Sequence, residues 1–251
     1  MEIHKRLLSM MKMEMSCIKN SLLSIAFIAF SISAIGQAAP DSNGFTIKTE
    51  ATNLKADSLK DGKWMEYLDA NSHVTPDTNA PYYRLTIYKK GIPYGIVRGY
   101  TRKGMQCVKI TYRNGKKNGL SQTYEKGKVI TSTPYNNDSI DGVAKEFYES
   151  GGIKSEITYT HNKKNGVAKG YYEDGKLMTV DTNVNDMQNG VMIVYYESGK
   201  MRRKVNHLNG KLNGMILGYY ETGAVKYEIP CSNDVSGTVR NFDESGNEIK
   251  L

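Results

Sequence analysis

The chain has 251 residues and a formal net charge of +8, with 24 Gly and 18 Tyr but only 5 Phe, 1 Trp and 6 Pro. This length allows one or two domains, and the composition favours many short strands and turns over a thick aliphatic core. Aromatic and β-branched residues run along most of the chain, which excludes a disordered protein. The lysines are dispersed among acids, which indicates a solvated surface and argues against a nucleic-acid partner.

The first forty residues have the features of an export signal. Four basic residues precede the uncharged run SLLSIAFIAFSISAIG, and small residues follow it. The run has 16 residues, fewer than the roughly 20 that span a bilayer. We therefore predict a signal peptide over residues 1–38, cleaved near Gly36 to Ala38. The mature protein would be exported to the periplasm or outer envelope, or secreted; an uncleaved N-terminal anchor is the alternative.

An internal repeat dominates the remainder of the chain. A glycine recurs at intervals of 33, 24, 23, 24, 24, 24 and 23 residues. These glycines are Gly62, Gly95, Gly119, Gly142, Gly166, Gly190, Gly214 and Gly237. Five residues after each stands an aromatic residue, which we expect to be structural because every copy has it. The aromatics are Tyr67, Tyr100, Tyr124, Phe147, Tyr171, Tyr195, Tyr219 and Phe242.

Each repeat has the pattern of one β-hairpin. A strand such as VAKGYYE leads into a turn such as EDGK or ESGK, and a second strand such as GIKSEITYT follows. A second turn, HNKKNG or LNGKLNG, then reverses the chain, with Asn-Gly suited to the left-handed conformation. Glycine about every dozen residues argues against helix. The predicted fold is all-β: an elongated single-layer antiparallel sheet of about eight tandem hairpins with a period of 23–24 residues.

The period also sets the expected domain boundaries. The repeat domain should cover residues 61–251, with an insertion near 69–80 in the first copy and a truncated last copy. Residues 39–60 are either a linker or an edge strand. Cys107 and Cys231 lie five repeats apart, or roughly 50 Å at about 10 Å per hairpin. We therefore expect no disulfide between them within one chain.

The cores NG…YYE-x-GK at 165–176, 189–200 and 213–223 resemble the MORN repeat, and more closely its bacterial variant, found in YwqK-like "antitoxin component" proteins. Weaker copies lie at 95–104, 118–128, 141–151 and 236–246. The resemblance implies a single-layer sheet of hairpins used for protein or membrane association. The antitoxin description fits poorly with an export signal, because an exported protein would not encounter a toxin in the cytoplasm.

A second aromatic series gives the candidate binding site. It follows the first directly in the central copies, at Tyr148, Tyr172, Tyr196 and Tyr220. Small residues nearby, Gly170 and Gly218, would let the rings lie flat across the strand. One interpretation is cross-strand packing that shields a thin sheet. The other is an aromatic platform for sugar rings, lipid head groups or side chains of a partner.

Signals for catalysis are weak. His73, His161 and His207 do not stack in register, and no Ser-His-Asp order, HExxH, P-loop or Cys-x-x-Cys motif is present. We predict no enzyme, no cofactor and no metal site. The expected function is an exported, non-catalytic scaffold that binds a protein partner in the cell envelope. The alternatives are a module that docks on lipid or glycan and a self-assembling envelope protein.

Overall fold

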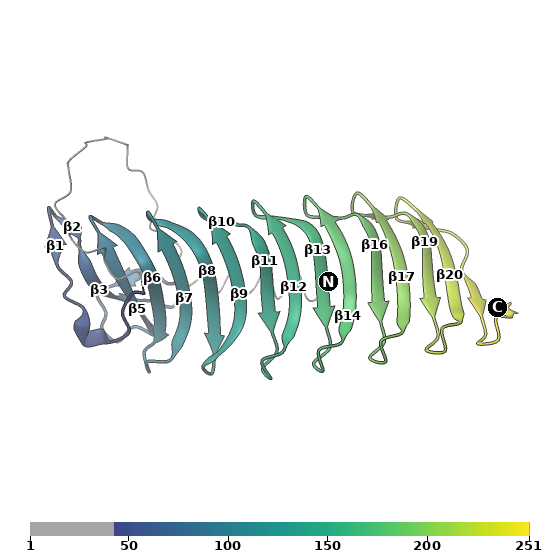
Figure 1. Cartoon of the computed structure of the whole chain (residues 1–251), viewed down its shortest axis with the longest axis horizontal. Coiled ribbons are helices and arrows are strands. Elements are labelled where there is room, and N and C mark those ends of the chain that lie inside the picture. Colours follow the sequence, from purple (N-terminus) through teal and green to yellow (C-terminus); the bar gives the residue numbers. More distant parts are fainter. Residues whose placement is uncertain (1–42, 251) are drawn as a thin grey trace. The chain divides into compact units, whose positions relative to one another are not determined.

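The structure is a computed structural model that describes residues 43–250. The predicted signal peptide over residues 1–38 lies outside the described residues. Strand follows strand along the chain, and helix within residues 43–250 is limited to the 3₁₀ turn Lys48–Glu50. Successive strands pair as antiparallel hairpins (Figure 1), which confirms the all-β repeat fold. The chain forms two compact units, an N-terminal unit up to Lys128 and a C-terminal unit from Val129.

The N-terminal unit is an antiparallel sheet in chain order. Its main strands are β3 (Gly62–Leu68), β5 (Tyr82–Lys89), β6 (Ile92–Thr101), β7 (Gln106–Arg113) and β8 (Lys116–Glu125). The short β4 (Val74–Thr75) pairs with the end of β3, between residues 69 and 81 where the first copy is longer. Two further strands, β1 (Lys55–Ala56) and β2 (Leu59–Lys60), form a separate two-stranded sheet.

The C-terminal unit repeats one hairpin design. The longer strands are β9 (Lys128–Asn136), β11 (Gly142–Phe147), β12 (Ile153–Thr160), β13 (Lys163–Tyr171), β14 (Leu177–Val184), β16 (Gly190–Tyr195), β17 (Met201–Leu208), β19 (Gly214–Tyr219) and β20 (Val225–Ser232). Short strands continue the pairing after the turns: β10 (Ser139–Ile140), β15 (Met187–Gln188), β18 (Lys211–Leu212), β21 (Val235–Ser236), β22 (Arg240–Phe242) and β23 (Glu248–Ile249). Successive longer strands pair antiparallel, and each short strand after a tight turn pairs with the longer strand before it.

Two kinds of turn separate the strands. The acidic-Gly turn is as predicted: Gly199 has φ +84° and donates its N–H to the carbonyl of Tyr196 at 2.9 Å. The other turn is tighter than predicted, because in HNKKNG the two left-handed residues are His161 and Asn162, with φ of 49° and 68°. A two-residue turn with both φ values positive matches the twist of the strands it joins. Gly166 follows four residues after Asn162, inside β13, with φ +123°.

Five hairpins carry one extra residue in the second strand. Val194 pairs with Arg203 and Tyr195 with Met201, so Arg202 is left without a partner residue as a β-bulge. The same shift leaves one extra residue in four other hairpins, namely Cys107, Lys154, Met178 and Lys226. Simple alternation of side chains between the two faces therefore fails at this point, and no feature of the sequence predicted the bulge.

The core of the C-terminal unit lies on one face of the sheet. Val205, Ile216 and Cys231 are buried from three successive strands, and Met192, Leu212, Tyr227 and Ile229 pack against them. Cys231 is a free thiol, as is Cys107 in the N-terminal unit. The ring of Tyr227 lies across Gly218: a Cβ added at Gly218 would be 2.1 Å from Tyr227 Cε1. Gly218 thus accommodates Tyr227 from the neighbouring strand, whereas the sequence had pointed to Tyr220.

The core of the N-terminal unit includes a residue from before the first strand. Phe45 is buried with Tyr83, Leu85, Ile87 and Tyr100. The rings of Tyr83 and Tyr100 are stacked, with centroids 5.1 Å apart. The Arg98 guanidinium donates to the carbonyl of Asn43 at 2.7 Å and holds this segment in place. Residues 43–60, left open as a linker or an edge strand, therefore contribute to the core, and β1 and β2 pair with each other and not with the main sheet.

We expect Gly218→Ala to lower the free energy of unfolding by about 1–3 kcal/mol, because the added methyl group forces the Tyr227 ring to move. Chemical denaturation measures the change. In a Tyr227→Ala background the same substitution should cost much less, since the obstructing ring is gone. Equal costs in the two backgrounds would mean that the ring does not lie over Gly218.

Candidate functional site

The second tyrosine series joins consecutive repeats of the C-terminal unit. The Tyr148 hydroxyl donates to the carbonyl of Tyr171 at 2.6 Å, and the Tyr172 hydroxyl donates to that of Tyr195 at 2.6 Å. Tyr196 and Tyr220 continue the pattern on the carbonyls of Tyr219 and Phe242, at 2.7 and 2.9 Å. Each hydroxyl therefore reaches the first aromatic residue of the next repeat. We call these four contacts the tyrosine links.

The bulged residues cover the rings of the same tyrosines. Lys154 Nζ lies 5.9 Å from the Tyr148 ring centroid, and Lys226 Nζ lies 5.2 Å from that of Tyr220. The Arg202 guanidinium lies 5.6 Å from the Tyr196 ring. A cation over an aromatic face is attracted by the ring quadrupole. With their hydroxyls bonded and their faces next to cations, these half-buried tyrosines have a structural role, and a binding role for them stays a proposal.

The first aromatic series lies on the face of the C-terminal sheet opposite to the second tyrosine series. The Tyr171 hydroxyl donates to Glu156 at 2.8 Å, and Glu156 also pairs with Lys145 at 2.8 Å. Desolvation, together with the hydrogen bond to Glu156, raises the pKa of Tyr171 to about 12. The remaining members of the series in this unit are half-buried: Phe147, Tyr195, Tyr219 and Phe242.

In the N-terminal unit the first series contributes to the core. Tyr100 is buried, and Tyr67 packs against the same cluster. The Tyr124 hydroxyl donates to the side chain of Gln122 at 3.2 Å, from a half-buried position near the end of β8.

A row of exposed apolar side chains, which sequence reasoning missed, runs across the C-terminal sheet. Val143, Val167, Val191 and Met215 each follow a repeat glycine, and they are 38–43% exposed. We call them the valine row. One strand lies between successive members, so they are spaced about 10 Å apart. The signal was present in the sequence as an apolar residue directly after each glycine.

The register accounts for the residues between members of the valine row. Thr158 lies opposite Val143, and its hydroxyl donates to the carbonyl of Val167 at 2.8 Å. Asn206 lies opposite Val191 and donates in the same way to the carbonyl of Met215 at 3.1 Å. The two carbonyls belong to the residues that follow Gly166 and Gly214. At these two members of the valine row the backbone carbonyl therefore has a side-chain donor.

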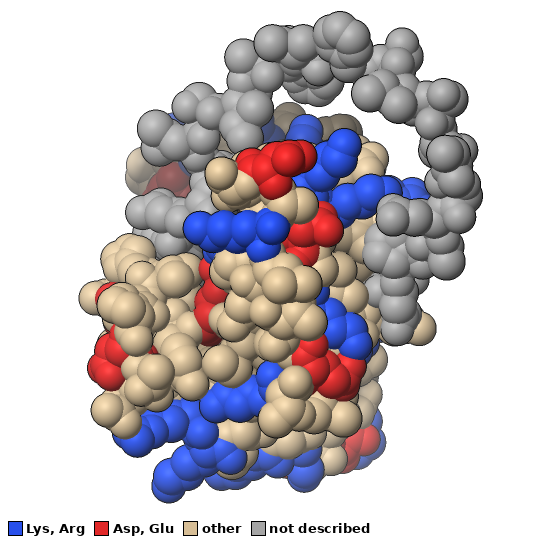
Figure 2. Space-filling model, turned by 90° about the vertical axis from the view of Figure 1, so that its left-hand side faces the viewer, with Lys and Arg blue, Asp and Glu red and all other residues tan. Residues whose placement is uncertain are grey.

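Charges of both signs border the valine row. Two residues further along the same strands, and so on the same face, stand Lys145, Lys169, Ile193 and Leu217. Glu156 pairs with Lys145, and Glu228 pairs with Arg240 at 3.4 Å. Figure 2 looks at the side of the molecule that lies on the left in Figure 1, where Lys and Arg side chains lie among Asp and Glu and gather along the lower edge. The border is mixed in sign and is not a basic patch.

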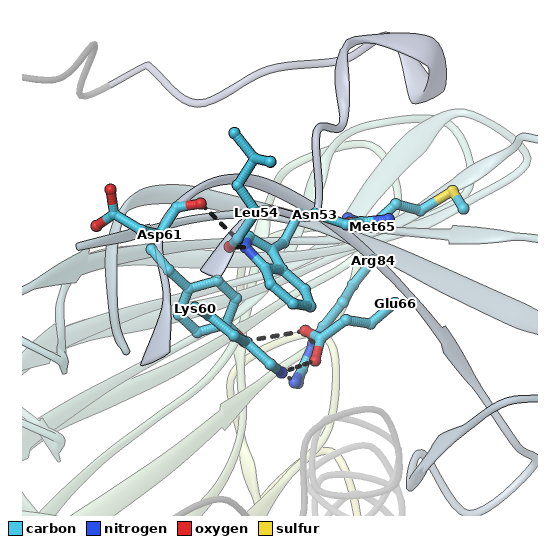
Figure 3. A network of polar contacts seen from close by, with 9 residues as sticks. Asn53, Leu54, Lys60, Asp61, Met65, Glu66 and Arg84 are labelled. Atoms are coloured by element: carbon cyan, nitrogen blue, oxygen red, sulfur yellow. Dashed lines mark hydrogen bonds and ion pairs between the residues drawn. The ribbon is translucent and has the colours of Figure 1, made fainter. Parts of the chain in front are cut away.

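A charged network occupies one face of the N-terminal sheet (Figure 3). Glu66 Oε2 accepts hydrogen bonds from Arg84 Nε at 2.8 Å and from the Tyr88 hydroxyl at 2.9 Å, and Glu66 Oε1 accepts one from Lys60. Burial alone would raise the pKa of the Glu66 carboxyl, but Arg84 and Lys60 outweigh it and lower that pKa below its ordinary value. Sequence reasoning missed this network because its members come from three separate strands.

The histidines do not converge on a reactive group. His161 is an exposed turn residue, and His73 Nδ1 lies 3.5 Å from Asp69 Oδ2. Burial lowers the pKa of His207 on β17. Within residues 43–250 no three His, Cys, Asp or Glu side chains are grouped to hold a metal ion. No helix among these residues is long and apolar enough to cross a membrane.

Comparison with known families matches the regular part of the C-terminal unit. The family model described as "MORN repeat variant" matches residues 140–161, 164–181 and 188–209. Three adjacent repeats therefore match this model. Each matched segment contains one member of the valine row, and MORN repeats are generally non-catalytic scaffold elements. No curated protein matches the chain.

Solved structures give only a distant likeness. One is S. aureus TarM, at 13% identity and a TM-score of 0.30, which covers 42% of this chain and 20% of that one. Another is a mutant of S. aureus TarM in complex with Fondaparinux, alpha-GlcNAc-glycerol and UDP, at 12% identity and a TM-score of 0.29. That match covers 38% of this chain and 19% of the TarM mutant. Neither likeness bears on function.

Removing a tyrosine link should weaken the sheet. We expect Tyr172→Phe and Tyr196→Phe each to reduce the free energy of unfolding by about 0.5–1.5 kcal/mol, since each leaves a carbonyl without its hydroxyl donor. Urea denaturation measures the loss. The matched control is Tyr195→Phe, whose hydroxyl makes no hydrogen bond within residues 43–250. If all three variants were equally stable, the hydroxyls would not be holding repeats together.

Acid should destabilise the native chain in part through Glu66. The folded-state pKa of Glu66 lies below the unfolded value of 4.5, so its contribution is present above that value and is lost as the pH falls through the folded pKa. We expect the free energy of unfolding to decline more steeply in acid for the native chain than for Glu66→Gln. Urea titrations at a series of pH values compare the two slopes. Parallel curves would show that Glu66 is not specifically stabilised as a carboxylate.

Proposed function

We propose that this protein is a non-catalytic repeat scaffold that binds a protein partner through the valine row. The observation that carries the proposal is the 38–43% exposure of four apolar side chains repeated at one position of successive hairpins. Exposed apolar side chains gathered on one face and rimmed by polar residues commonly mark an interaction site. The likeness of three repeats to MORN variants supports a scaffold role.

The border of the valine row favours a protein over a lipid surface. Protein interfaces combine an apolar centre with a polar rim of both charge signs. Attraction to anionic lipid instead relies on cations alone, whereas the four cations of the bordering row, Lys145, Lys169, Lys204 and Arg240, are interspersed with acids. Glu156 pairs with Lys145, and Glu228 pairs with Arg240. Docking of glycan or lipid on the second tyrosine series is less favoured, because the tyrosine links already use its hydroxyls.

The proposal includes export to the cell envelope. Its support is the uncharged run after basic residues within residues 1–38. Placement among the YwqK-like proteins rests on the quoted repeat cores. An antitoxin role is not part of the proposal, because an exported chain would not meet a cytoplasmic toxin. Cell fractionation and the N-terminal sequence of the recovered protein test this point: a chain that begins at Met1 in the cytoplasm would contradict it.

Site-directed photocross-linking tests the docking surface. A photoreactive phenylalanine analogue replaces Val167 or Val191 in the full chain, expressed in its native cells. The control position is Val184, which is similarly exposed at 39% but lies at the end of β14 next to the turn. We expect one discrete protein adduct from both positions of the valine row and none from the turn.

Charge in the valine row should abolish that adduct. With the photoreactive analogue at Val167, Val143→Asp combined with Val191→Asp buries two carboxylates in the proposed interface, and we expect at least a tenfold loss of cross-linking, in line with the several kcal/mol cost of unpaired buried charge. Val184→Asp should leave it unchanged. Adducts of the chain with itself would instead indicate self-assembly. Cross-links to lipid or glycan alone would overturn the protein-partner proposal.

A further inference from the structure

We infer that Trp64, Glu66 and Tyr88 form a binding site for a primary ammonium group, which Lys60 of the same chain occupies in this structure. Trp64 and Glu66 stand two residues apart on β3, so they share a face. Tyr88 comes from the paired strand β5. Figure 3 shows the side chains of Lys60, Glu66 and Arg84 converging on this face.

Two aromatic rings form the walls of the site. The rings of Trp64 and Tyr88 meet edge to face, with centroids 6.2 Å apart and planes at 84°. Lys60 Nζ lies 5.1 Å from the Trp64 ring and 5.0 Å from the Tyr88 ring. Two rings at near right angles around one cation are the arrangement that recognises alkylammonium groups. The present occupant shows that a primary amine on an alkyl chain fits.

Glu66 supplies the negative charge. Its side chain is only 4% exposed, and Arg84 and Tyr88 together fix one oxygen. The other oxygen accepts from Lys60. Removing Lys60 would leave this oxygen beside the aromatic walls without its cation, and a buried carboxylate oxygen without a donor is costly. Thr86, opposite Trp64 in the register, adds a buried hydroxyl that has no hydrogen-bond partner within residues 43–250.

The segment that carries Lys60 is attached more weakly than the strands beneath it. β1 and β2 pair only with each other, and Lys55, Ala56 and Leu59 are exposed. The Trp64 indole N–H donates to the carbonyls of Leu54 at 2.9 Å and Asp61 at 3.1 Å. By contrast, β3 pairs with β5 at every residue from Gly62 to Leu68. The Lys60 backbone is held, since its carbonyl accepts the Gly91 N–H at 2.7 Å, but its side chain is 33% exposed. The Lys60 ammonium group can therefore swing out while the walls and Glu66 stay in place, so an external ammonium group competes with it.

The test uses Trp64 as its own reporter, because it is the single tryptophan of the chain. Lys60→Met keeps the alkyl stem and removes the competing cation. The full-length variant is titrated with n-butylammonium chloride at constant ionic strength while tryptophan emission is followed. We expect a saturable change in Lys60→Met and an apparent affinity at least about tenfold weaker in the native chain, where the site is already filled.

Two controls show whether the response comes from the site. Glu66→Gln added to Lys60→Met should abolish it, and so should Tyr88→Leu, which removes one wall and leaves the reporter. Circular dichroism confirms that each variant is folded, and Lys60→Gln replaces Lys60→Met if the latter is not. No saturable response in a folded Lys60 variant, or an unchanged response after both second substitutions, overturns the inference.

Further arms identify the source of the ammonium group. Nα-acetyl-lysine amide represents a protein side chain, and phosphoethanolamine represents a lipid head group. Tetramethylammonium, which has no N–H donor, should bind more weakly than n-butylammonium because it cannot hydrogen-bond to Glu66. Equal binding of the two would contradict the role assigned to Glu66. Whichever of Nα-acetyl-lysine amide and phosphoethanolamine binds more tightly indicates the source. Neither of these affinity comparisons depends on the valine row.

Discussion

The extra residue in the second strand of four hairpins is the constraint on which the rest of the C-terminal sheet depends. A β-bulge offsets two residues of one strand against one of its partner and increases the local twist. Here it directs Lys154, Arg202 and Lys226 to the face that carries the second tyrosine series. The first aromatic series stays on the opposite face, where Tyr171 meets Glu156. Two adjacent tyrosines can thus serve two different faces.

The tyrosine links explain how a thin sheet holds together. A single two-stranded hairpin is marginal in water, and stability in repeat proteins comes from the interfaces between neighbours. Backbone pairing provides part of each interface, as in the contacts of Thr179 with Val194 and Val180 with Ile193. The hydroxyl of Tyr172 adds a second connection at the same end of the strands, because it bonds the carbonyl of Tyr195, the residue after Val194. At the other end, Asn183 pairs with Gln188 and Val184 with Met187, so consecutive hairpins are joined at both ends of the strand.

The sequence was sufficient to predict the architecture because glycine and aromatic positions recur with one period. Strands, acidic-Gly turns and the antiparallel order followed from that period together with turn chemistry. The tight turns were misplaced, because Asn-Gly appears in the sequence both at a true turn, Asn209–Gly210, and inside a strand, Asn165–Gly166. Local preference cannot separate the two, and only the register of the neighbouring strand does.

The sites were harder to predict than the fold. The sequence shows an apolar residue after each repeat glycine, but it does not predict that these side chains are exposed. Alternation along a strand does not say which face of a single-layer sheet remains open. The Glu66 network was invisible, because Lys60, Glu66 and Arg84 meet only once β2, β3 and β5 are in place. Contacts of that kind depend on tertiary structure and carry no spacing in the sequence.

Because each tyrosine link connects a repeat only to the next one, the design has no fixed length. A segment of about 24 residues that begins at one repeat glycine and ends before the next contains a complete donor and a complete acceptor. Duplication or loss of such a segment in the gene would leave every remaining link with a partner of the same kind. The chain can therefore change its number of repeats during evolution without redesigning its interior, and a binding surface built on the repeats would grow or shrink in equal steps.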